Sequence, residues 1–486
     1  MRLTLAPTAA PSGGPDLGGV LTLDGLARAY AAGASPAGVV RVVLARIAAR
    51  GNDHAWISVR SAAELAAETE AVAARWPDPA ARPALFGVPY AVKDNIDVAG
   101  LPTTAACPGY AYRPAADAPL VARLREAGAI CVGKTNLDQF ATGLSGTRSP
   151  YGACESPLLP GLISGGSSSG SAVAVAAGLV PFSIGTDTAG SGRVPAALCG
   201  ITGLKPSRGL VSTLGTVPAC ASLDCPSVFA TSVADASAVL AVIAAFEPGD
   251  PWSRPLPVPP SVPAASGPLR TGVPRDPEFY GDAAAAAAFA AVVRAVGDAA
   301  GRAGQPGQET GGGREGAALV RDISDFLLAG RLLYEGPWVA ERLAAVGDFA
   351  AAHPDRLHPV TRAVLDSGRG YSAADAFAGL HRLAGLRAAT RTVWESVDVL
   401  LVPTVPTTFT VEEMLADPVR RNSVLGHYTT FANLLDLCAI AIPAGFTAAG
   451  RPHGVTLLAP AGADGLLAGA AAWLERLLGA RSQQAG

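Results

Sequence analysis

A long stretch of the chain, from about residue 84 to Phe246, is rich in glycine, low in charge and broken into short apolar runs. This texture is typical of buried strands and short helices joined by tight turns, because strands covered on both faces read as apolar runs. Further apolar runs follow residue 397, and helical patterns lie between the two regions. Strands from both ends of the chain then share one sheet, which predicts a single interleaved α/β domain.

Local patterns divide the remaining chain into elements. Ser35 and Pro36 have the residue types of an N-cap and a first helical position, and they separate two helices within residues 16–51. Further helices are expected within 61–76, from 118 to Gly128, and within 282–304, 317–346, 372–395 and 462–480. Strands are expected within 84–97, 129–133, 268–276, 397–406, 437–445 and 453–460, a proline-rich connector at 247–268 and a loop at 304–316.

The composition excludes several classes of protein. Charged residues make up 16% of the chain and apolar residues 49%, which argues against disorder, and a net charge of −3 provides no basic face for nucleic acid. No uninterrupted apolar run reaches the roughly 18 residues of a membrane span, and the first residues lack a signal-peptide pattern. Seven scattered cysteines favour reduced thiols in the cytoplasm, and neither Cys220 nor Cys225 has partners at metal-ligand spacing.

Two motifs match known patterns in the wrong setting. The segment "GAICVGKT" (128–135) fits a phosphate-binding loop, but the expected strand lies inside the pattern, where extended backbone cannot wrap around phosphates. The segment "GSSSG" (166–170) fits a nucleophile elbow with Ser168 as nucleophile. An elbow needs a strand directly before it, and the preceding residues read as a loop, so Ser168 remains a minor alternative.

The chain lacks histidine between His54 and His353, so a nucleophile in the glycine-rich region needs another base. Lys93 ends an apolar run, and burial there would lower its pKa enough for it to accept a proton. The alternative is a strand-end lysine that reaches solvent. Small residues around Ser191 allow a sharp turn with successive N–H groups, as an oxyanion hole requires, or simply an ordinary glycine-rich turn.

Three separated motifs, "AVKDN", "GAICVGKTNLDQFATG" and the segment from "GGSSSGSAVAVAAG" to "GITGLKP", together resemble the amidase signature family. The resemblance implies a central mixed β-sheet covered by helices on both faces. It implies a Ser–Ser–Lys triad with Ser191 as nucleophile, Ser167 as the bridging serine and Lys93 as base. The oxyanion N–H groups fall on Thr188, Ala189, Gly190 and Ser191.

Several segments resemble the allophanate hydrolase branch of this family, among them "GTRSPYGAC", "VPACASLDCPSVFA" and "LLYEGPWVAERLAAV". That likeness assigns substrate contacts to Tyr334 and Arg342. The guanidinium of Arg342 suits a carboxylate, because its N–H groups can form two parallel hydrogen bonds to it. Gly143 is expected to line the pocket. The alternative for Arg342 is an ion pair with Glu335 or Glu341 on a solvated helix.

The resemblance therefore implies hydrolysis of allophanate, a small anionic amide, as the second step of urea degradation. It implies no cofactor or metal, a cytoplasmic homodimer and a functional link to a urea carboxylase. Alternatives are another amidase of this family, acting on a carboxybiuret-like or aliphatic amide, and the amidase component of a tRNA-dependent amidotransferase. We expect an N-terminal tail at 1–18, the amidase domain at 19–480, a C-terminal tail at 481–486 and no additional C-terminal domain.

Overall fold

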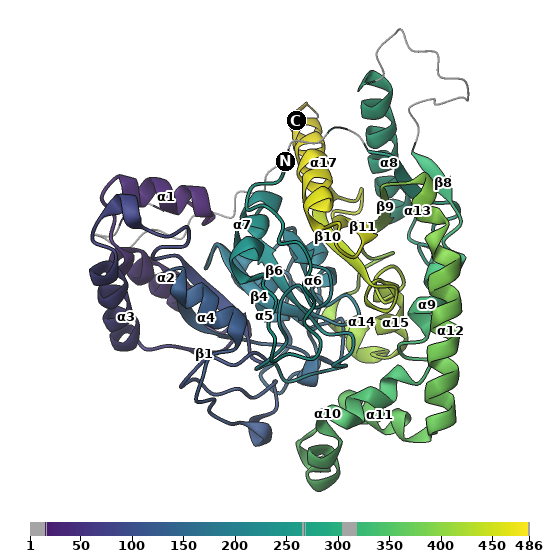
Figure 1. Cartoon of the computed structure of the whole chain (residues 1–486), viewed down its shortest axis with the longest axis horizontal. Helices are drawn as coiled ribbons and strands as arrows, with labels where there is room; N and C mark the ends of the chain where they lie inside the picture. The colour runs from purple at the N-terminus through teal and green to yellow at the C-terminus, as the bar shows by residue number, and fades with distance from the viewer. Residues whose placement is uncertain (1–14, 16, 265–266, 268, 304–317, 485–486) are drawn as a thin grey trace.

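The computed structural model describes residues 15, 17–264, 267, 269–303 and 318–484. Its centre is an 11-stranded sheet in the order β1-β3-β2-β4-β6-β5-β10-β11-β9-β7-β8 (Figure 1). The strands are β1 (Trp56–Val59), β2 (Pro89–Lys93), β3 (Ile130–Thr135), β4 (Phe182–Asp187), β5 (Thr202–Lys205), β6 (Cys225–Ala230), β7 (Thr271–Pro274), β8 (Leu319–Arg321), β9 (Val399–Pro403), β10 (Leu437–Phe446) and β11 (Pro452–Pro460).

The sheet is mixed, and its parallel pairs lie away from its middle. Strand β2 runs parallel to both β3 and β4, and β7 runs parallel to β8 and β9. The central ladders β4–β6, β6–β5, β5–β10 and β10–β11 are antiparallel. Strands β1–β6 from the first half of the chain form one side of this sheet, and β7–β11 from the second half form the other. The two sides join at the β5–β10 ladder, so both regions share one mixed sheet, as an α/β fold predicts.

Seventeen α-helices surround the sheet in the described part of the chain. They are α1 (Leu23–Ala31), α2 (Pro36–Arg50), α3 (Ala62–Arg75), α4 (Pro119–Glu126), α5 (Ser169–Ala176), α6 (Val194–Cys199), α7 (Val233–Ile243), α8 (Ala283–Ala303), α9 (Ser324–Arg331), α10 (Trp338–Ala352), α11 (Pro359–Ser367), α12 (Ala373–Arg391), α13 (Val393–Ser396), α14 (Val411–Ala416), α15 (Arg420–Leu425), α16 (Phe431–Leu434) and α17 (Asp464–Gln484). Side-chain caps begin many of them. For example, Ser35 caps α2 with Pro36 in the first turn, as the sequence predicts.

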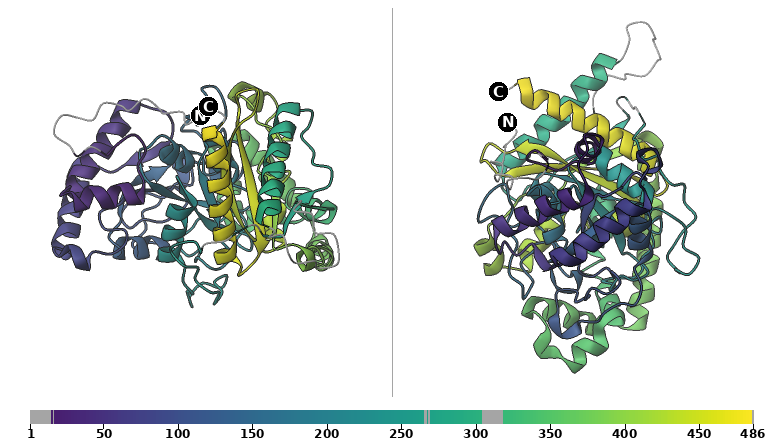
Figure 2. Two further views of the ribbon diagram at one scale, coloured as in Figure 1. Left: turned by 90° about the horizontal axis from the view of Figure 1, so that it is seen from above. Right: turned by 90° about the vertical axis from the view of Figure 1, so that its left-hand side faces the viewer.

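The helices cover both faces of the sheet. Helices α7 and α17 pack against each other, α4 packs on α7, and α5 and α6 form another neighbouring pair (Figures 1 and 2). Helices α10 and α11 lie away from the sheet, at the bottom of Figure 1, beside the long helix α12. This peripheral position matters for the site described below.

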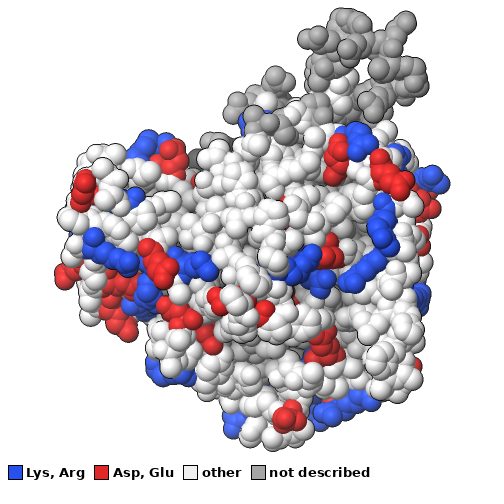
Figure 3. Space-filling view, viewed as in Figure 1, with Lys and Arg blue, Asp and Glu red and all other residues white. Residues whose placement is uncertain are grey.

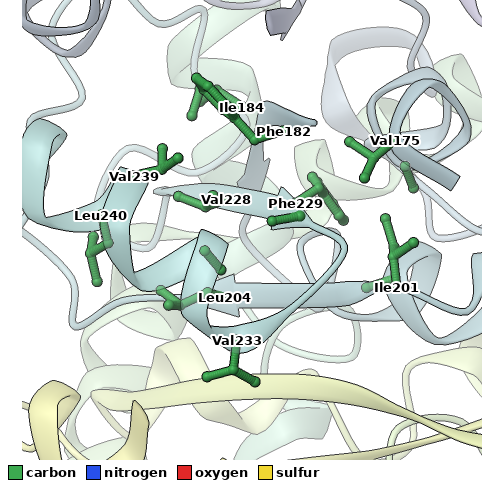
Figure 4. Close-up of a cluster of buried hydrophobic side chains, with 14 of the residues drawn as sticks. Val175, Phe182, Ile184, Ile201, Leu204, Val228, Phe229, Val233, Val239 and Leu240 are labelled. Carbon is green, nitrogen blue, oxygen red and sulfur yellow. The ribbon is translucent and has the colours of Figure 1, made fainter. Parts of the chain in front are cut away.

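The largest core cluster lies between the sheet and its covering helices. Phe182 and Ile184 of β4, Val228 and Phe229 of β6 and Leu204 of β5 are buried there (Figure 4). Burial of one such aliphatic or aromatic side chain stabilises the fold by roughly 1.5–3 kcal/mol. The same strands carry polar residues at their ends, so this packing also fixes the place of the site.

Most expected elements are confirmed within one to five residues, and the differences are local. The expected helical region 317–346 begins instead with the short edge strand β8. Helix α17 continues to Gln484, past residue 481 where the tail is expected to begin. Of the expected tail 1–18, residues 1–14 and 16 lie outside the described residues, as does the expected loop 304–316.

One helix in the described ranges, Ala283–Gly301 within α8, is long and apolar enough to cross a membrane by length and composition alone. The expectation of no such run overlooked it, because Arg294 and Asp298 interrupt an otherwise alanine-rich stretch. Its stripe from Ala285 to Val296 is buried against the protein core. The face of the molecule in Figure 3 carries interspersed acidic and basic side chains around a largely uncharged middle.

Candidate active site

Two neighbouring parallel strands bring the predicted catalytic residues to one edge of the sheet. Lys93 is the last residue of β2, and β4 beside it ends at Asp187. Parallel strands present their carboxyl ends at the same edge, where sites in α/β sheets commonly form. Ser191 follows β4 in a tight turn, and Ser167 lies just before α5, so both serines arrive at this edge.

The three side chains form a continuous line of hydrogen bonds. Lys93 Nζ lies 2.8 Å from Ser167 Oγ, and Ser167 Oγ lies 3.0 Å from Ser191 Oγ. All three residues are buried, with at most 2% of their surface exposed. Thr186, which no sequence pattern singled out, lies 2.7 Å from Lys93 Nζ through its Oγ1. This arrangement can pass a proton from Ser191 to Lys93.

Burial controls the protonation of the lysine. It lowers the pKa of Lys93 to about 7, against the opposing effect of the carboxylates of Asp138, Asp224 and Asp187. A substantial share of Lys93 is therefore neutral near pH 7, which a general base requires.

The two motif matches take ordinary structural roles. Ser168 Oγ donates to the carbonyl oxygen of Thr186 at 3.0 Å and accepts its N–H at 3.3 Å, so Ser168 ties the loop to β4. The phosphate-loop match at 128–135 is largely the extended strand β3, as expected from the sequence.

The turn that carries Ser191 is braced by a buried ion pair. Asp187 accepts the N–H groups of Gly190 at 2.9 Å and Gly192 at 3.0 Å, and it pairs with Arg193 at 2.9 Å. Burial alone would raise the pKa of Asp187, but Arg193 and these N–H groups outweigh it and leave that pKa lowered. Gly190 has φ of +134°, and a Cβ there would lie 2.3 Å from Thr429 Oγ1, so the turn requires glycine.

The predicted oxyanion residues differ in what their N–H groups do. The Gly190 N–H is engaged by Asp187, so it is not open to a substrate oxygen in the way expected from the sequence. Among the described residues, the N–H groups of Thr188, Ala189 and Ser191 have no hydrogen-bond partner. Thr188 Oγ1 donates to Asp224, whose carboxylate also accepts the N–H groups of the 219–220 turn. Burial raises the pKa of Asp224 to about 6.

Gly143 reaches the site through its backbone. Ser191 Oγ lies 3.4 Å from the carbonyl oxygen of Gly143. The loop that follows is folded around Asp138, which accepts the N–H groups of Ser145, Gly146 and Arg148. A buried carboxylate with three N–H partners fixes a loop firmly.

Arg342 lies on α10 and is 2% exposed. Its Nη1 donates to Thr142 Oγ1 at 3.0 Å and its Nη2 to Tyr334 OH at 3.3 Å, while its buried Nε has no partner among the described residues. No carboxylate of the described chain lies within ion-pair distance of this guanidinium, so the alternative of a pair with Glu335 or Glu341 is wrong. A buried cation without a carboxylate partner points to a ligand that supplies one.

A second buried guanidinium lies close by. Arg148 Nη1 donates to the carbonyl oxygen of Thr142 at 2.9 Å, so Arg148 and Arg342 hold the same threonine from two sides. An open cleft of about 260 Å³ lies next to Tyr334, the hydrogen-bond partner of Arg342. Its lining includes Tyr334, Asn422 and His427, and Asn422 Oδ1 accepts the N–H of Leu144 next to Gly143.

In the described part of the chain, no group of three or more histidine, cysteine, aspartate or glutamate side chains is placed to hold a metal ion. All seven cysteines are buried and free of disulfides. Sequence reasoning missed Thr186, Asp138 and Asp224. Thr186 and Asp224 contact Lys93 and Thr188 from 93 and 36 residues away, while Asp138 braces the loop that follows it. The polar strand end "GTD" was the available signal for Thr186.

Comparisons with known proteins identify the family of the chain. The Amidase family model matches residues 38–302 and 349–468. The chain is 44% identical over 410 residues to urea amidolyase of Saccharomyces cerevisiae, a match that covers 84% of this chain and 21% of that relative. The chain thus spans about a fifth of the length of the urea amidolyases it matches.

Two further matches extend the comparison. The structure superposes on Kluyveromyces lactis allophanate hydrolase with a TM-score of 0.84 and 37% identity, covering 94% of this chain and 72% of that one. A component of the glutamyl-tRNA(Gln) amidotransferase of Synechococcus sp. is 35% identical over 393 residues, which is 77% of this chain and 80% of that protein. The chain therefore belongs to the amidase family of amide-cleaving hydrolases.

Proposed function

We propose that this chain hydrolyses allophanate, releasing ammonia through a Ser–Ser–Lys triad and a covalent acyl-enzyme. The observation that carries the proposal is the line Lys93–Ser167–Ser191 next to a buried Arg342 that lacks a carboxylate partner among the described residues. The first feature suits cleavage of an amide, and the second selects a substrate that brings its own negative charge. The similarity to K. lactis allophanate hydrolase supports the same substrate.

The first half-reaction forms the acyl-enzyme. Neutral Lys93 accepts the Ser167 proton as Ser167 accepts the Ser191 proton, and Ser191 Oγ bonds to the terminal amide carbon. The negative charge on the carbonyl oxygen is stabilised by the open N–H groups of Thr188, Ala189 and Ser191. Ser167 then returns a proton to the nitrogen, the C–N bond breaks, and ammonia leaves.

The second half-reaction regenerates the enzyme. A water molecule loses a proton to the same relay and attacks the carbonyl carbon, and the bond to Ser191 Oγ breaks as the serine regains a proton. The product is a nitrogen that carries two carboxyl groups, which loses carbon dioxide afterwards. Each cycle therefore consumes one water and releases one ammonia at the enzyme.

The substrate carboxylate would be bound by the residues around Arg342. The free Nε of Arg342 and the adjacent Nη2 can donate to a carboxylate, with Tyr334 OH beside them. Arg148 adds a second buried positive charge around Thr142. The Gly143 carbonyl oxygen, 3.4 Å from Ser191 Oγ, would accept from a substrate N–H. The cleft beside Tyr334 offers the approach for a small molecule.

The cellular setting follows from this substrate. We propose a cytoplasmic homodimer that works after a urea carboxylase, consistent with the urea amidolyase relatives.

The test is ammonia release from allophanate, with rapid acid quenching and intact-protein mass spectrometry. We expect turnover by the unaltered chain and a transient adduct whose peptide maps to Ser191. An active enzyme whose adduct maps to Ser168, or a chain that turns over glutamine but not allophanate, would contradict the proposal.

A further inference from the structure

A short turn, residues 219–224, joins the oxyanion segment to the helix that carries Arg342. At one end of the turn Asp224 accepts the hydroxyl of Thr188. In its middle Ser222 meets Glu341, which immediately precedes Arg342 on α10. Neither the triad nor the substrate contacts proposed above use Ser222 or Glu341.

The contact between Ser222 and Glu341 is two-pronged. Glu341 Oε1 accepts the Ser222 N–H at 2.8 Å, and Glu341 Oε2 accepts the Ser222 hydroxyl at 2.7 Å. Both carboxylate oxygens are therefore engaged by one residue, and hydrogen bonds to a charged acceptor are stronger than neutral ones. This is why Glu341 does not neutralise its neighbour Arg342. A weaker contact, Cys220 Sγ to the carbonyl oxygen of Trp338 at 3.5 Å, lies one helical turn earlier.

The position of Glu341 on the helix fixes the direction of Arg342. Successive residues on an α-helix project about 100° apart, so holding Glu341 against the turn sets the rotation of α10 about its axis. Arg342 then faces Thr142 and Tyr334. Pro337, the N-cap residue before the helix, provides no side-chain cap, so no capping hydrogen bond fixes that rotation at its start.

We propose that the Ser222–Glu341 pair positions Arg342 and thereby sets the preference for anionic over neutral amides. Through Asp224 in the same turn, the pair also keeps Arg342 at a fixed distance from the oxyanion residues. The inference rests on the proposed role of Arg342 in holding the substrate carboxylate. Glu341 and Ser222 are positioning residues that do not touch the substrate.

The experiment compares allophanate with biuret, in which a neutral amide replaces the carboxylate. For Glu341→Ala we expect KM for allophanate to rise about tenfold, the usual scale for loss of a charged hydrogen-bonded contact, with kcat within twofold. KM for biuret should stay within twofold. Glu341→Gln retains an acceptor for the Ser222 N–H and should restore most of the affinity. Asp348→Ala, at an exposed position of the same helix, is the matched control and should change KM for neither substrate.

Ser222→Ala tests the same pair from the other side and removes one of the two hydrogen bonds. Combined with Glu341→Ala, it should add nothing further, since both changes remove one contact. Equal changes in KM for both substrates, or additive effects of the two substitutions, would overturn the inference and indicate a general structural role. Arg342→Ala, measured alongside, separates the two claims. If Arg342→Ala raises KM equally for allophanate and biuret, the proposed recognition of the anion is itself wrong.

Discussion

The strand ends that hold the triad and the helix that holds Arg342 are built in different ways. Lys93 and Asp187 end neighbouring strands, and main-chain ladders on both sides fix them within the sheet. Helix α10 lies at the periphery, and side chains such as Thr142 and Ser222 attach it to the rest of the site. The sheet therefore determines where bond cleavage takes place, while the attached helix determines which amide is held there.

This division gives each region a distinct kinetic signature. A change at the strand ends removes stabilisation of the transition state and lowers kcat for every amide. A change at α10 removes binding of one charged group and raises KM for anionic substrates alone.

The largest effect is expected for Ser191→Ala, which removes the attacking oxygen. Ammonia release from every substrate should fall at least about 1,000-fold, as loss of a nucleophile does elsewhere, with the thermal midpoint of unfolding little changed. Ser168→Ala is the matched control and should keep most activity, since its hydroxyl contacts only the Thr186 backbone. The reverse ranking of the two variants would name Ser168 as the nucleophile.

The next effect is the pH dependence of kcat/KM. Lys93 accepts a proton only when neutral, and its pKa is lowered to about 7. On a stable amide such as malonamate, kcat/KM should fall about tenfold per pH unit below pH 7 and level off above it. A flat profile between pH 5 and pH 8 would remove Lys93 as the base.

Arg342→Ala should act on binding alone. Loss of a buried guanidinium fork should raise KM for allophanate about 30-fold, while KM for biuret changes less than about threefold. Arg362→Ala, an exposed arginine on α11, serves as the control. An equal rise for both substrates would place Arg342 outside the carboxylate site.

The smallest effect is expected for Thr188→Val, which keeps the shape of the side chain and removes the hydroxyl that donates to Asp224. We expect kcat to fall about fivefold with KM unchanged, the scale of one buried hydrogen bond. Thr142→Val, on the other side of the site, should instead raise KM for allophanate and spare kcat. If both variants changed kcat and KM in the same way, the proposed distinction between the two regions would be wrong.

The strand ends that hold the triad could be predicted from the sequence, because apolar runs, glycines and the order of three motifs are local signals. Lys93 at the end of β2 and the helix after Ser167 follow from such patterns. The geometry that joins them was not readable, since it depends on contacts between segments far apart in the chain.

Two of the misjudged features share one cause. Asp187 folds back onto the Gly190 N–H, and Glu341 turns to Ser222, more than a hundred residues away, instead of to Arg342. Patterns in a single sequence identify hydrogen-bond donors and acceptors, but they do not show which donor pairs with which acceptor. The strand β8 was missed because it has only three residues, too few for a periodic pattern.

The most direct test of the central claim is one panel of kcat/KM values for allophanate, biuret, malonamate and glutamine. The strand-end triad cleaves amides, and the α10 site selects a small anion, so allophanate should exceed each of the others by at least about tenfold. Malonamate, which is also a small anion, should come second. Comparable values for allophanate and biuret, or a preference for glutamine, would contradict the account.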